Sequence, residues 1–547
     1  MASGERLGRI KIYKTDISQY VLLRPFFSYP IKKLIVNPLP SNPPLTEAQK
    51  IELLEKKLQW AELRIQALEA RLRLELIRKY GPKSETLNGA QLLLLELEPG
   101  VSSAEVEAES QREPMPPASS PLAKKPHKSR PHPGRQELPA DLPRVERVIA
   151  CTPQQCVCQS CGKETVVIGY EQSEHLDVEP ARFFVVVTRR EKRACRCCIG
   201  GVSAAPLPAR IIDKGLVSDR VVIDTLVSKY CDHLPLYRQS AILEREAKVV
   251  ISRATMDGWV MTVGGLLVPI GTTIGRELVA GGYIQADETP IPVQMHDKSG
   301  KNHQAYLWQY GRPGGSALFD FQMGRGREGP KKFLREFKGI LQTDGYVAYD
   351  HVGGSGMVHA CCWAHARRKV FDALKLNPDD RLAIQLISQM DELFAIDAEA
   401  RQAGLDPAAR HALRQERSRP LLDVLKKDML SAHAAVLPAS ALGKAISYTL
   451  SLWDKLTRFL EYPQLELSNN LAENSMRPVA LGRKNWIHVG SQQAGLKVAA
   501  ILSVIESCRR LKLPVREYLA SVLPGLADLP VSRLPQLTPA AWAASRH

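Results

Sequence analysis

The 547-residue sequence lacks two features that would place it in a membrane or outside the cell, and it has few acidic residues for its number of basic ones. It has no uninterrupted run of about 18 apolar residues, so no membrane-spanning helix is expected. Its first residues lack the basic, apolar and small-residue regions of a secretion signal. Acidic residues are too few to balance the basic ones, with 58 Asp and Glu against 74 Lys and Arg. We therefore expect a cytoplasmic protein with no membrane partner.

The net charge of +16 favours a polyanionic partner, most simply a nucleic acid, although many basic proteins have no such partner. The 11 cysteines are clustered, and without an export signal their clustering indicates metal binding rather than disulfides. The length predicts several domains, and a hydrophobic content of 44% is ordinary for a globular protein.

The most informative stretch of the chain contains two short apolar runs that each end on an aspartate. The first ends at Asp287 and is interrupted by Pro290 and Pro292, and the second ends at Asp344 before Gly345. Apolar runs of this length between turn residues predict buried strands. A sheet formed from both strands would bring the two aspartates side by side. The alternative is that each aspartate is an ordinary turn or capping residue.

A third carboxylate, Glu473, is the candidate that completes a metal site with these aspartates. Asn470 is suited to cap a helix that Pro478 would end or kink, which places Glu473 on the first turn. Carboxylates crowded together repel one another, and a divalent cation removes that repulsion. Mg²⁺ (or Mn²⁺) prefers such hard oxygen ligands, and two ions about 3.5–4 Å apart are suited to phosphoryl transfer.

Two Cys-x-x-Cys pairs predict a structural zinc site. The predicted ligands are Cys158, Cys161, Cys195 and Cys198. Each pair is suited to hold one side of a tetrahedral Zn²⁺, and four thiolates leave no open catalytic position. The strand-like run from Phe183 to Thr188 would contribute to a hairpin beneath the metal. Cys156 and Cys197 are alternative ligands.

The first 145 residues divide into three segments by their patterns. Residues 1–44 are proline-rich and unassigned, residues 45–98 hold a helix, and residues 99–145 have the composition of a disordered linker. The helix has apolar residues spaced alternately three and four apart, which predicts a coiled coil and a homo-oligomer; a helix packed on its own domain is the alternative. These seam residues are Ile51, Leu54, Leu58, Ala61, Ile65, Leu68 and Leu72.

The remaining chain predicts a multidomain α+β protein. After a zinc-binding domain at 146–210, helices at 221–230, 236–246 and 253–263 indicate a helix-turn-helix-like region at 211–275, or else a plain helical subdomain. Strands at 305–311 and 316–321, a helix with Phe333 and Phe337, and the two strands ending in aspartate match a ribonuclease H-like core at 276–495. An all-α insertion is expected at about 370–462. In the C-terminal region, 496–547, a helix from about 496 to 511 should pack on the sheet, and the tail beyond Leu523 should be loose.

Basic and aromatic residues near the predicted carboxylates are candidates for DNA contact. Phosphate contacts and base stacking use such side chains. The alternative for the first group is a solvated basic face on a helix with a core tryptophan. The candidates are His365, Arg367, Arg368, Arg477, Arg483, Lys484 and Trp486.

Five motifs, in this order along the chain, resemble those of transposases of the insertion sequence 66 family. They are Ala-Asp-Glu-Thr-Pro at 286–290, Leu-Gln-Thr-Asp-Gly-Tyr at 341–346, Cys-Trp-Ala-His-Ala-Arg-Arg-Lys at 362–369, Asn-Asn-Leu-Ala-Glu at 469–473, and Arg-Pro-Val-Ala-Leu-Gly-Arg-Lys-Asn-Trp at 477–486. The similarity runs from about residue 45 to about 525. Two positions depart from the family pattern, because Ser468 replaces an Asp and Asn474 replaces an Arg. The loss of these two charges would affect the reaction rate or the binding of DNA.

The resemblance implies DNA transposition of the DDE type in a bacterial cytoplasm, with the protein on the nucleoid when bound to DNA. Asp287, Asp344 and Glu473 would then be the catalytic carboxylates, the zinc module would contact DNA, and accessory proteins encoded by the same element are possible partners. Two other functions stay open. One is a zinc-dependent DNA-binding protein without catalysis, and the other is a ribonuclease H-like nuclease that cuts but does not join DNA.

Overall fold

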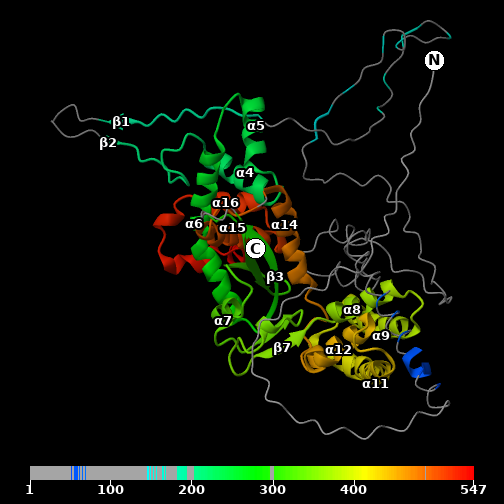
Figure 1. Cartoon of the computed structure of the whole chain (residues 1–547). Coiled ribbons are helices and arrows are strands. Elements are labelled where there is room, and N and C mark those ends of the chain that lie inside the picture. The colour runs from blue at the N-terminus through cyan, green and yellow to red at the C-terminus, as the bar shows by residue number, and fades with distance from the viewer. Residues whose placement is uncertain are drawn as a thin grey trace, which may run out of the picture. The chain divides into compact units, whose positions relative to one another are not determined.

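The structure is a computed structural model whose chain divides into two units, Met1–Ile65 and Gln66–His547. Figure 1 shows the elements with their labels. The four predicted zinc ligands lie outside the described residues. The residues described are 51, 54–58, 61, 65, 68, 144–146, 148, 152, 156, 160, 163, 164, 167, 170, 182–193, 203–295, 301–486 and 488–546.

The predicted N-terminal seam is helical wherever the structure describes it. Its large apolar side chains are solvent-exposed, by 55% at Ile51 and 63% at Leu54. Leu72 lies outside the described residues. A single helix of a coiled coil, without its partner helix, would expose such an apolar seam, so the coiled coil stays a prediction.

A five-stranded mixed sheet carries the predicted aspartates. Its order is β5-β4-β3-β6-β7, in which β3, β4 and β5 are antiparallel while β6 and β7 run parallel to β3. The predicted strands are confirmed, and a short helix, α7, joins β5 to β6 but ends before Phe337. The bounds are Tyr283–Val293 (β3), His303–Gly311 (β4), Ala317–Gln322 (β5), Glu328–Leu334 (α7), Ile340–Thr343 (β6), Val347–Tyr349 (η1) and Val358–Cys361 (β7).

The prediction that Pro290 and Pro292 interrupt the first strand is wrong, because β3 continues through both to Val293. The carbonyl of Pro292 accepts a hydrogen bond from the Val489 amide, on the edge of β3 that faces away from β4. Residues two apart in a strand direct their backbone groups to the same side, so Pro290 shares this orientation. The missing N–H groups therefore leave the β3–β4 ladder intact, which is the position where strands tolerate proline.

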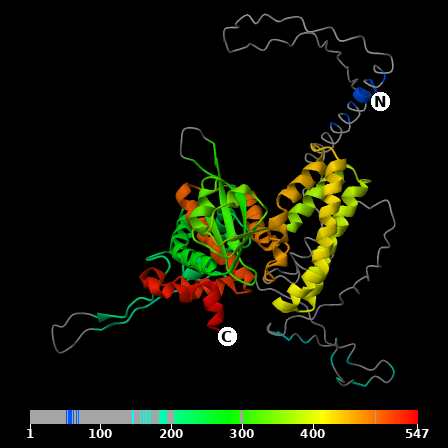
Figure 2. The same ribbon diagram turned by 90° about the horizontal axis from the view of Figure 1, so that it is seen from below.

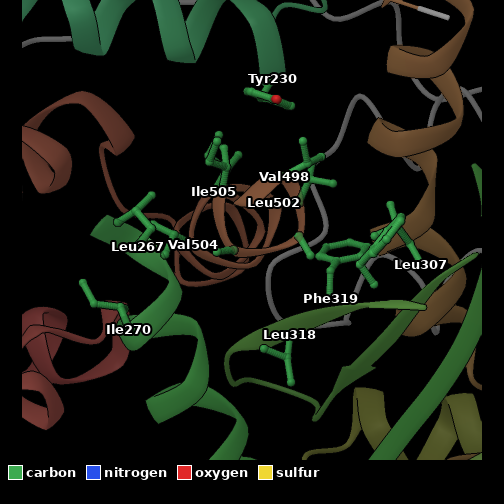
Figure 3. Packing of buried hydrophobic residues seen from close by; sticks show 14 of the residues in the cluster. Tyr230, Leu267, Ile270, Leu307, Leu318, Phe319, Val498, Leu502, Val504 and Ile505 are labelled. Carbon is green, nitrogen blue, oxygen red and sulfur yellow. The ribbon is translucent and has the colours of Figure 1, made fainter. Parts of the chain in front are cut away.

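Three helices precede the sheet, and two long helices pack against it. The helices are α4 (Asp219–Tyr230), α5 (Leu236–Ala247), α6 (Arg253–Ala280) and, later in the chain, α15 (Gln492–Arg510). Helix α6 is much longer than the short third helix that was predicted. Figure 3 shows α15 between α6 and the sheet, with Leu267, Leu502 and Phe319 in one apolar cluster. The predicted packing of the 496–511 helix on the sheet is confirmed.

Helix α6 is long and apolar enough to cross a membrane, judged by length and composition alone. However, 56% of its most apolar window is buried inside the protein. A Cβ added at Gly264 would lie 2.7 Å from the Lys497 Cβ, so α6 and α15 approach closely there. These contacts identify α6 as a core helix of its unit.

Helix α15 also closes the outer edge of the sheet. The Ser503 hydroxyl accepts the amide of Phe319 at 2.8 Å, and the Ser507 hydroxyl accepts the amide of Ala317 at 3.0 Å. Unpaired edge groups invite pairing with other chains, and these serines satisfy part of that edge.

The predicted all-α insertion is confirmed as a separate apolar cluster between β7 and the helix of Glu473. Figure 2 shows its helices packed together in yellow and orange. The elements are α8 (Trp363–Leu376), α9 (Arg381–Gln402), α10 (Pro407–Leu413), the π-helical turn η2 (Arg414–Ser418), α11 (Arg419–Ala435), α12 (Ala441–Ser451), α13 (Trp453–Thr457) and η3 (Arg458–Leu460).

The C-terminal tail is folded, so the prediction of a loose tail is wrong. Its elements are α16 (Val515–Val522), η4 (Leu526–Asp528), η5 (Val531–Leu537) and α17 (Pro539–Ala544). The Tyr518 hydroxyl donates to the carbonyl of Leu537 at 2.6 Å, and the Trp542 ring packs edge-on against Tyr518. Aromatic contacts from α16 thus compensate for the proline- and alanine-rich composition of the tail.

In the zinc-binding region, the run from Phe183 to Thr188 forms no strand, contrary to prediction. The paired strands nearby are β1 (Lys192–Arg193) and β2 (Ser203–Ala204), which are antiparallel. The apolar side chains of the run are exposed, by 87% at Val185. Without partners in the described part of the chain, β-branched residues alone do not make a strand.

Candidate active site

The parallel pairing of β3 with β6 sets the two aspartates opposite each other. Gln285 of β3 pairs with Gln342 of β6. The same register continued by two residues matches Asp287 with Asp344, just past the last paired residues. Asp287 lies within β3 and pairs with Gln309 of β4, so the prediction that it ends its strand is wrong. Asp287 instead lies two residues beyond the last β3–β6 pair, so it still stands where the pairing of these two strands ends.

A tight turn holds Asp344. The amide of Tyr346 donates to the Asp344 carboxylate at 2.8 Å, and the Tyr448 hydroxyl donates to the Asp344 carbonyl. Gly345 has a φ of +90°, and a Cβ there would lie 2.6 Å from a methyl carbon of Leu452. Both the backbone conformation and the lack of space therefore require glycine.

A hydroxyl–imidazole–carboxylate series supports this turn. Thr343 Oγ1 lies 2.9 Å from His359 Nε2, and His359 Nδ1 lies 3.2 Å from Asp350. Burial, and then the charge of Lys455, lower the pKa of His359 to about 4, so the imidazole is neutral at pH 7. Thr343 is fully buried and accepts the amide of Gly345 at 3.1 Å, so the series acts as a support for the turn and not as a nucleophile.

Glu473 approaches the aspartates from helix α14 (Asn470–Trp486). It lies in the first turn as predicted, but the helix continues through Pro478, which was expected to end or kink it. Residues on both sides of the proline, Met476 and Val479, are buried in the core and hold the second half of the helix in place. The carbonyl of Asn469 accepts the amides of residues 472 and 473, so Asn469 rather than Asn470 stands at the helix start.

Negative charge is crowded around Asp287. Burial raises the pKa of Asp287 well above its ordinary value, and Glu473, Glu288 and Asp344 raise it further. Burial also raises the pKa of Glu288, whose side chain is 2% exposed, although hydrogen bonds from Arg325 and Tyr349 offset part of this rise. At Asp287, the neighbouring carboxylates thus outweigh the one cation, His365, that lowers its pKa.

Helix α8 contributes a positive wall beside Glu473. His365 Nε2 lies 3.4 Å and an Arg368 guanidinium nitrogen 3.6 Å from the Glu473 carboxylate. Burial alone would lower the pKa of His365, but Glu473 and, after it, Cys362 together outweigh this effect and raise the pKa to about 10. His365 is therefore positively charged at pH 7.

The other candidates for DNA contact differ in burial and in partners. Arg367 is buried and bonds Asp391 of α9. Arg477 is half-buried, and Lys484 is exposed. Arg483 donates to the Thr289 hydroxyl at 3.1 Å and to the carbonyl of Pro290. Trp486 packs edge-on against Tyr230, with the Lys229 ammonium 5.6 Å from its ring.

Sequence reasoning missed the residues that surround Glu288. Arg325 donates to the Glu288 carboxylate at 2.7 Å and stacks on the ring of Tyr346, 4.1 Å from its centroid. Tyr349 donates to the other Glu288 oxygen at 2.8 Å. An acidic residue directly after Asp287 was the one signal in the sequence, but its partners come from distant positions.

The donor set fits a divalent cation in chemistry and charge. Two aspartates in matched register and a nearby glutamate supply the hard oxygen atoms that Mg²⁺ prefers. Burial first, and then repulsion from neighbouring carboxylates, raises the pKa of Asp287, and a cation would relieve that repulsion. In the part of the chain that the structure describes, no group of three His, Cys, Asp or Glu side chains is already arranged around a metal position. Glu473 instead faces His365 and Arg368.

Comparison with known families gives three matches along the chain. The model described as "Transposase IS66 family" matches residues 214–497. The zinc-finger binding domain of transposase IS66 matches residues 155–198, a range that includes all four predicted zinc ligands. A third model, "Transposase C of IS166 homeodomain", matches residues 67–147.

Relatives of similar length occur in Sinorhizobium fredii (strain NBRC 101917 / NGR234). Uncharacterized protein y4hP is 32% identical over 510 residues, which cover 88% of each chain. Uncharacterized protein y4qI is 35% identical over 423 residues, 74% of this chain and 77% of the relative. Because the transposase model spans more than half of the sequence and includes the positions of the carboxylates described above, the chain belongs to the IS66 family of transposases.

Proposed function

We propose that this transposase catalyses metal-dependent cleavage and strand transfer of DNA, with Asp287, Asp344 and Glu473 as its catalytic carboxylates. The observation that carries the proposal is the β3–β6 register, which matches Asp287 with Asp344 beside the helix of Glu473. The strand order β5-β4-β3-β6-β7, with three antiparallel strands followed by two parallel ones, supports a ribonuclease H-like core.

The three carboxylates would hold Mg²⁺ or Mn²⁺, and bound cations would supply the Lewis acidity that assists the attacking and leaving oxygens. In the first step, water attacks the phosphodiester at an element end, and the bond to the 3′ oxygen breaks. The released 3′-hydroxyl then attacks a phosphodiester of target DNA, and the 3′ oxygen of the target leaves. Both steps exchange one P–O bond for another, so no oxidant or covalent protein intermediate is required.

The positive residues on α8 are suited to receive the DNA backbone. His365 is charged at pH 7 and Arg368 is 39% exposed, both beside Glu473. Such contacts position a phosphate without reading its sequence. Sequence recognition would fall to the zinc-binding domain or to α4–α6, and the exposed N-terminal seam would pair two copies of the chain into a homo-oligomer.

A second candidate, a DNA-binding relative that has lost catalysis, is favoured by one observation. Asn474, where the family has arginine, is buried, and its amide nitrogen has no hydrogen-bond partner among the described residues. Ser468, where the family has aspartate, is half-buried in the segment before α14. Reversion of both positions, Ser468→Asp and Asn474→Arg, would restore joining if their loss is the cause.

The decisive experiment is a strand-transfer assay on labelled duplexes that carry the ends of the element. The wild type is compared with Asp287→Ala, Asp344→Ala and Glu473→Ala, in Mg²⁺ and in chelator. Asp320→Ala is the matched control, because Asp320 is a half-buried carboxylate of β5 in the same sheet but outside the site. Joined products that require Mg²⁺ and vanish only in the three site variants support the proposal. Cutting without joining favours a nuclease, and binding without chemistry favours the relative that has lost catalysis.

A further inference from the structure

Two buried glutamines lie directly beneath the two aspartates. Gln285 and Gln342 are fully buried and are cross-strand partners in β3 and β6. Each precedes an aspartate by two residues, so glutamine and aspartate share one face of their strand. The motif Gln-x-Asp thus occurs in both strands, and its two glutamines are paired across the β3–β6 ladder.

The glutamine amides form one hydrogen-bonded group with Tyr283. Gln285 Nε2 lies 3.0 Å from Gln342 Oε1 and 2.9 Å from the Tyr283 hydroxyl. The Tyr283 hydroxyl in turn donates to Gln342 Oε1 at 2.5 Å. The three side chains therefore fix one another across the β3–β6 pair.

The same amides also hold a distant segment that leads to Glu473. Gln342 Nε2 donates to the carbonyl of Glu466 at 2.7 Å. The carbonyl of Ser468 lies 3.0 Å from Gln285 Nε2, whose two hydrogens are shared among this carbonyl, Gln342 Oε1 and the Tyr283 hydroxyl. The carbonyl between them, that of Leu467, accepts the amide of Trp363 at 2.8 Å. Residues 466–468 are thus attached to the sheet on one side and to α8 on the other.

The next residue transmits this attachment to the helix of Glu473. The Asn469 side chain donates to the carbonyl of Ala286 at 3.2 Å, next to Asp287. The Asn469 carbonyl accepts the amide of Glu473 at 3.2 Å. Three of these hydrogen bonds attach residues 466–469 to the strands of the two aspartates, and the fourth lies within the start of the helix that carries the third carboxylate.

Gln285 Oε1 is buried and has no hydrogen-bond partner among the described residues. A buried amide with an unmade contact is costly compared with an apolar side chain, so stability alone does not explain this glutamine. We propose that Gln285 and Gln342 are positioning residues that hold Glu473 at the correct distance from Asp287 and Asp344. This inference rests on the proposed function, because it assigns the glutamines to the same three-carboxylate site. They touch no reacting atom themselves.

The test measures Mg²⁺ binding to the full-length chain by isothermal titration calorimetry, together with its melting temperature in chelator. The variants are Gln285→Met and Gln342→Met, which keep side-chain length but remove the amide. Loss of a group that orients metal ligands weakens metal binding by about 10- to 100-fold, and we expect that loss in both variants.

Gln239→Met is the matched control. Gln239 is also a buried glutamine whose amide donates to two carbonyls, those of Thr225 and Leu234, but it lies in α5 outside the site. We expect this variant to lower the melting temperature and leave Mg²⁺ affinity unchanged. If the site glutamines behave in the same way as Gln239, their role is merely structural and the inference is wrong.

Two further variants separate this inference from the proposed function. Asp287→Asn and Asp344→Asn should remove Mg²⁺ binding; if they leave it intact, the proposed function itself fails. If they remove it while the methionine variants keep wild-type affinity, only the positioning role fails. Should the methionine variants not fold, Tyr283→Phe decides: weaker Mg²⁺ binding supports the inference, and wild-type binding overturns it.

Discussion

Two groups of carboxylates, one in the helical insertion and one at the sheet, have opposite electrostatic surroundings. In the helical insertion, Asp397 is 2% exposed and is bonded by Arg410 at 2.6 Å and by Arg414 at 2.7 Å. Glu466 nearby is bonded by Arg410 and Arg401. At the sheet, Asp287 and Asp344 form no ion pair within the described part of the chain, although further carboxylates adjoin them.

The pKa values follow the same division. Burial opposes ionisation of Asp397, but Arg414 and Arg410 outweigh it and lower its pKa. Burial raises the pKa of Asp287, and the neighbouring carboxylates add to the rise. Asp397, matched by arginines, serves the fold, whereas a raised pKa among neighbouring carboxylates, as at Asp287, is typical of functional sites.

The largest expected effect is on the matched side of the comparison. Asp397→Ala leaves Arg414 buried without its partner, and we expect it to lower the free energy of unfolding by about 3–5 kcal/mol. Asp287→Ala should lower it far less, because repulsion is removed at the same time. Urea denaturation of both variants checks this; equal losses would mean that the two clusters do not differ in kind.

The turn beside Asp344 offers a second, smaller test. Gly345→Ala should cost at least about 1 kcal/mol from its positive φ, and the contact with Leu452 should displace Asp344 as well. Gly404→Ala is the control, because Gly404 also has a positive φ (+62°) but nothing lies within 4 Å of an added Cβ. We expect both variants to lower the melting temperature and only Gly345→Ala to reduce strand transfer. Equal activity in the two would remove the turn from the catalytic account.

The two regions should also respond to acid in opposite directions. The lowered pKa of Asp397 gives stability above its ordinary value of about 3.9, which is lost as the pH falls through its folded-state pKa. The raised pKa of Asp287 means that protonation favours the folded sheet, so its contribution improves as the pH falls from neutral. Hydrogen exchange of peptides from each region, corrected for intrinsic rates, measures both trends. Parallel trends would contradict the comparison.

The smallest effect on stability is expected for a carboxylate that forms a solvent-exposed ion pair, with neither a buried arginine partner nor neighbouring carboxylates. Asp224 of α4 pairs with Arg516 at the surface, and both side chains are more than half exposed. Asp224→Ala should change the free energy of unfolding by at most about 1 kcal/mol. A loss near that of Asp397→Ala, in the same urea assay, would show that burial is not what separates these pairs.

Local patterns predicted what depends on local sequence. The apolar runs ending in Asp287 and Asp344 formed neighbouring strands, and Glu473 fell on the first turn of its helix. The effect of the two prolines of β3 was predicted wrongly. A proline interrupts a strand only where its missing N–H group would have pointed toward a neighbouring strand, and the sequence does not show that direction. The tail was misjudged because its order comes from contacts with Tyr518, which composition does not reveal.

The glutamines illustrate the same limit within the site. Gln285 and Gln342 were visible as a repeated Gln-x-Asp word, but their partners are the carbonyls of Glu466 and Ser468. No pattern in the sequence joins positions so far apart. The electrostatic neighbours of Glu473 on α8 could be named in advance only because the family words contained them.

The measurement that tests the central claim most directly is the melting temperature of the full-length protein with and without Mg²⁺. Mg²⁺ is suitable because the thiolates of the zinc-binding domain favour softer metals. We predict that Mg²⁺ stabilises the wild type, by about 2.7 kcal/mol at a hundred times its Kd. Asp287→Asn should melt at or above the wild-type temperature without metal and should not respond to Mg²⁺. A wild type that ignores Mg²⁺, or an Asp287→Asn variant as unstable as Asp397→Ala, would contradict the account.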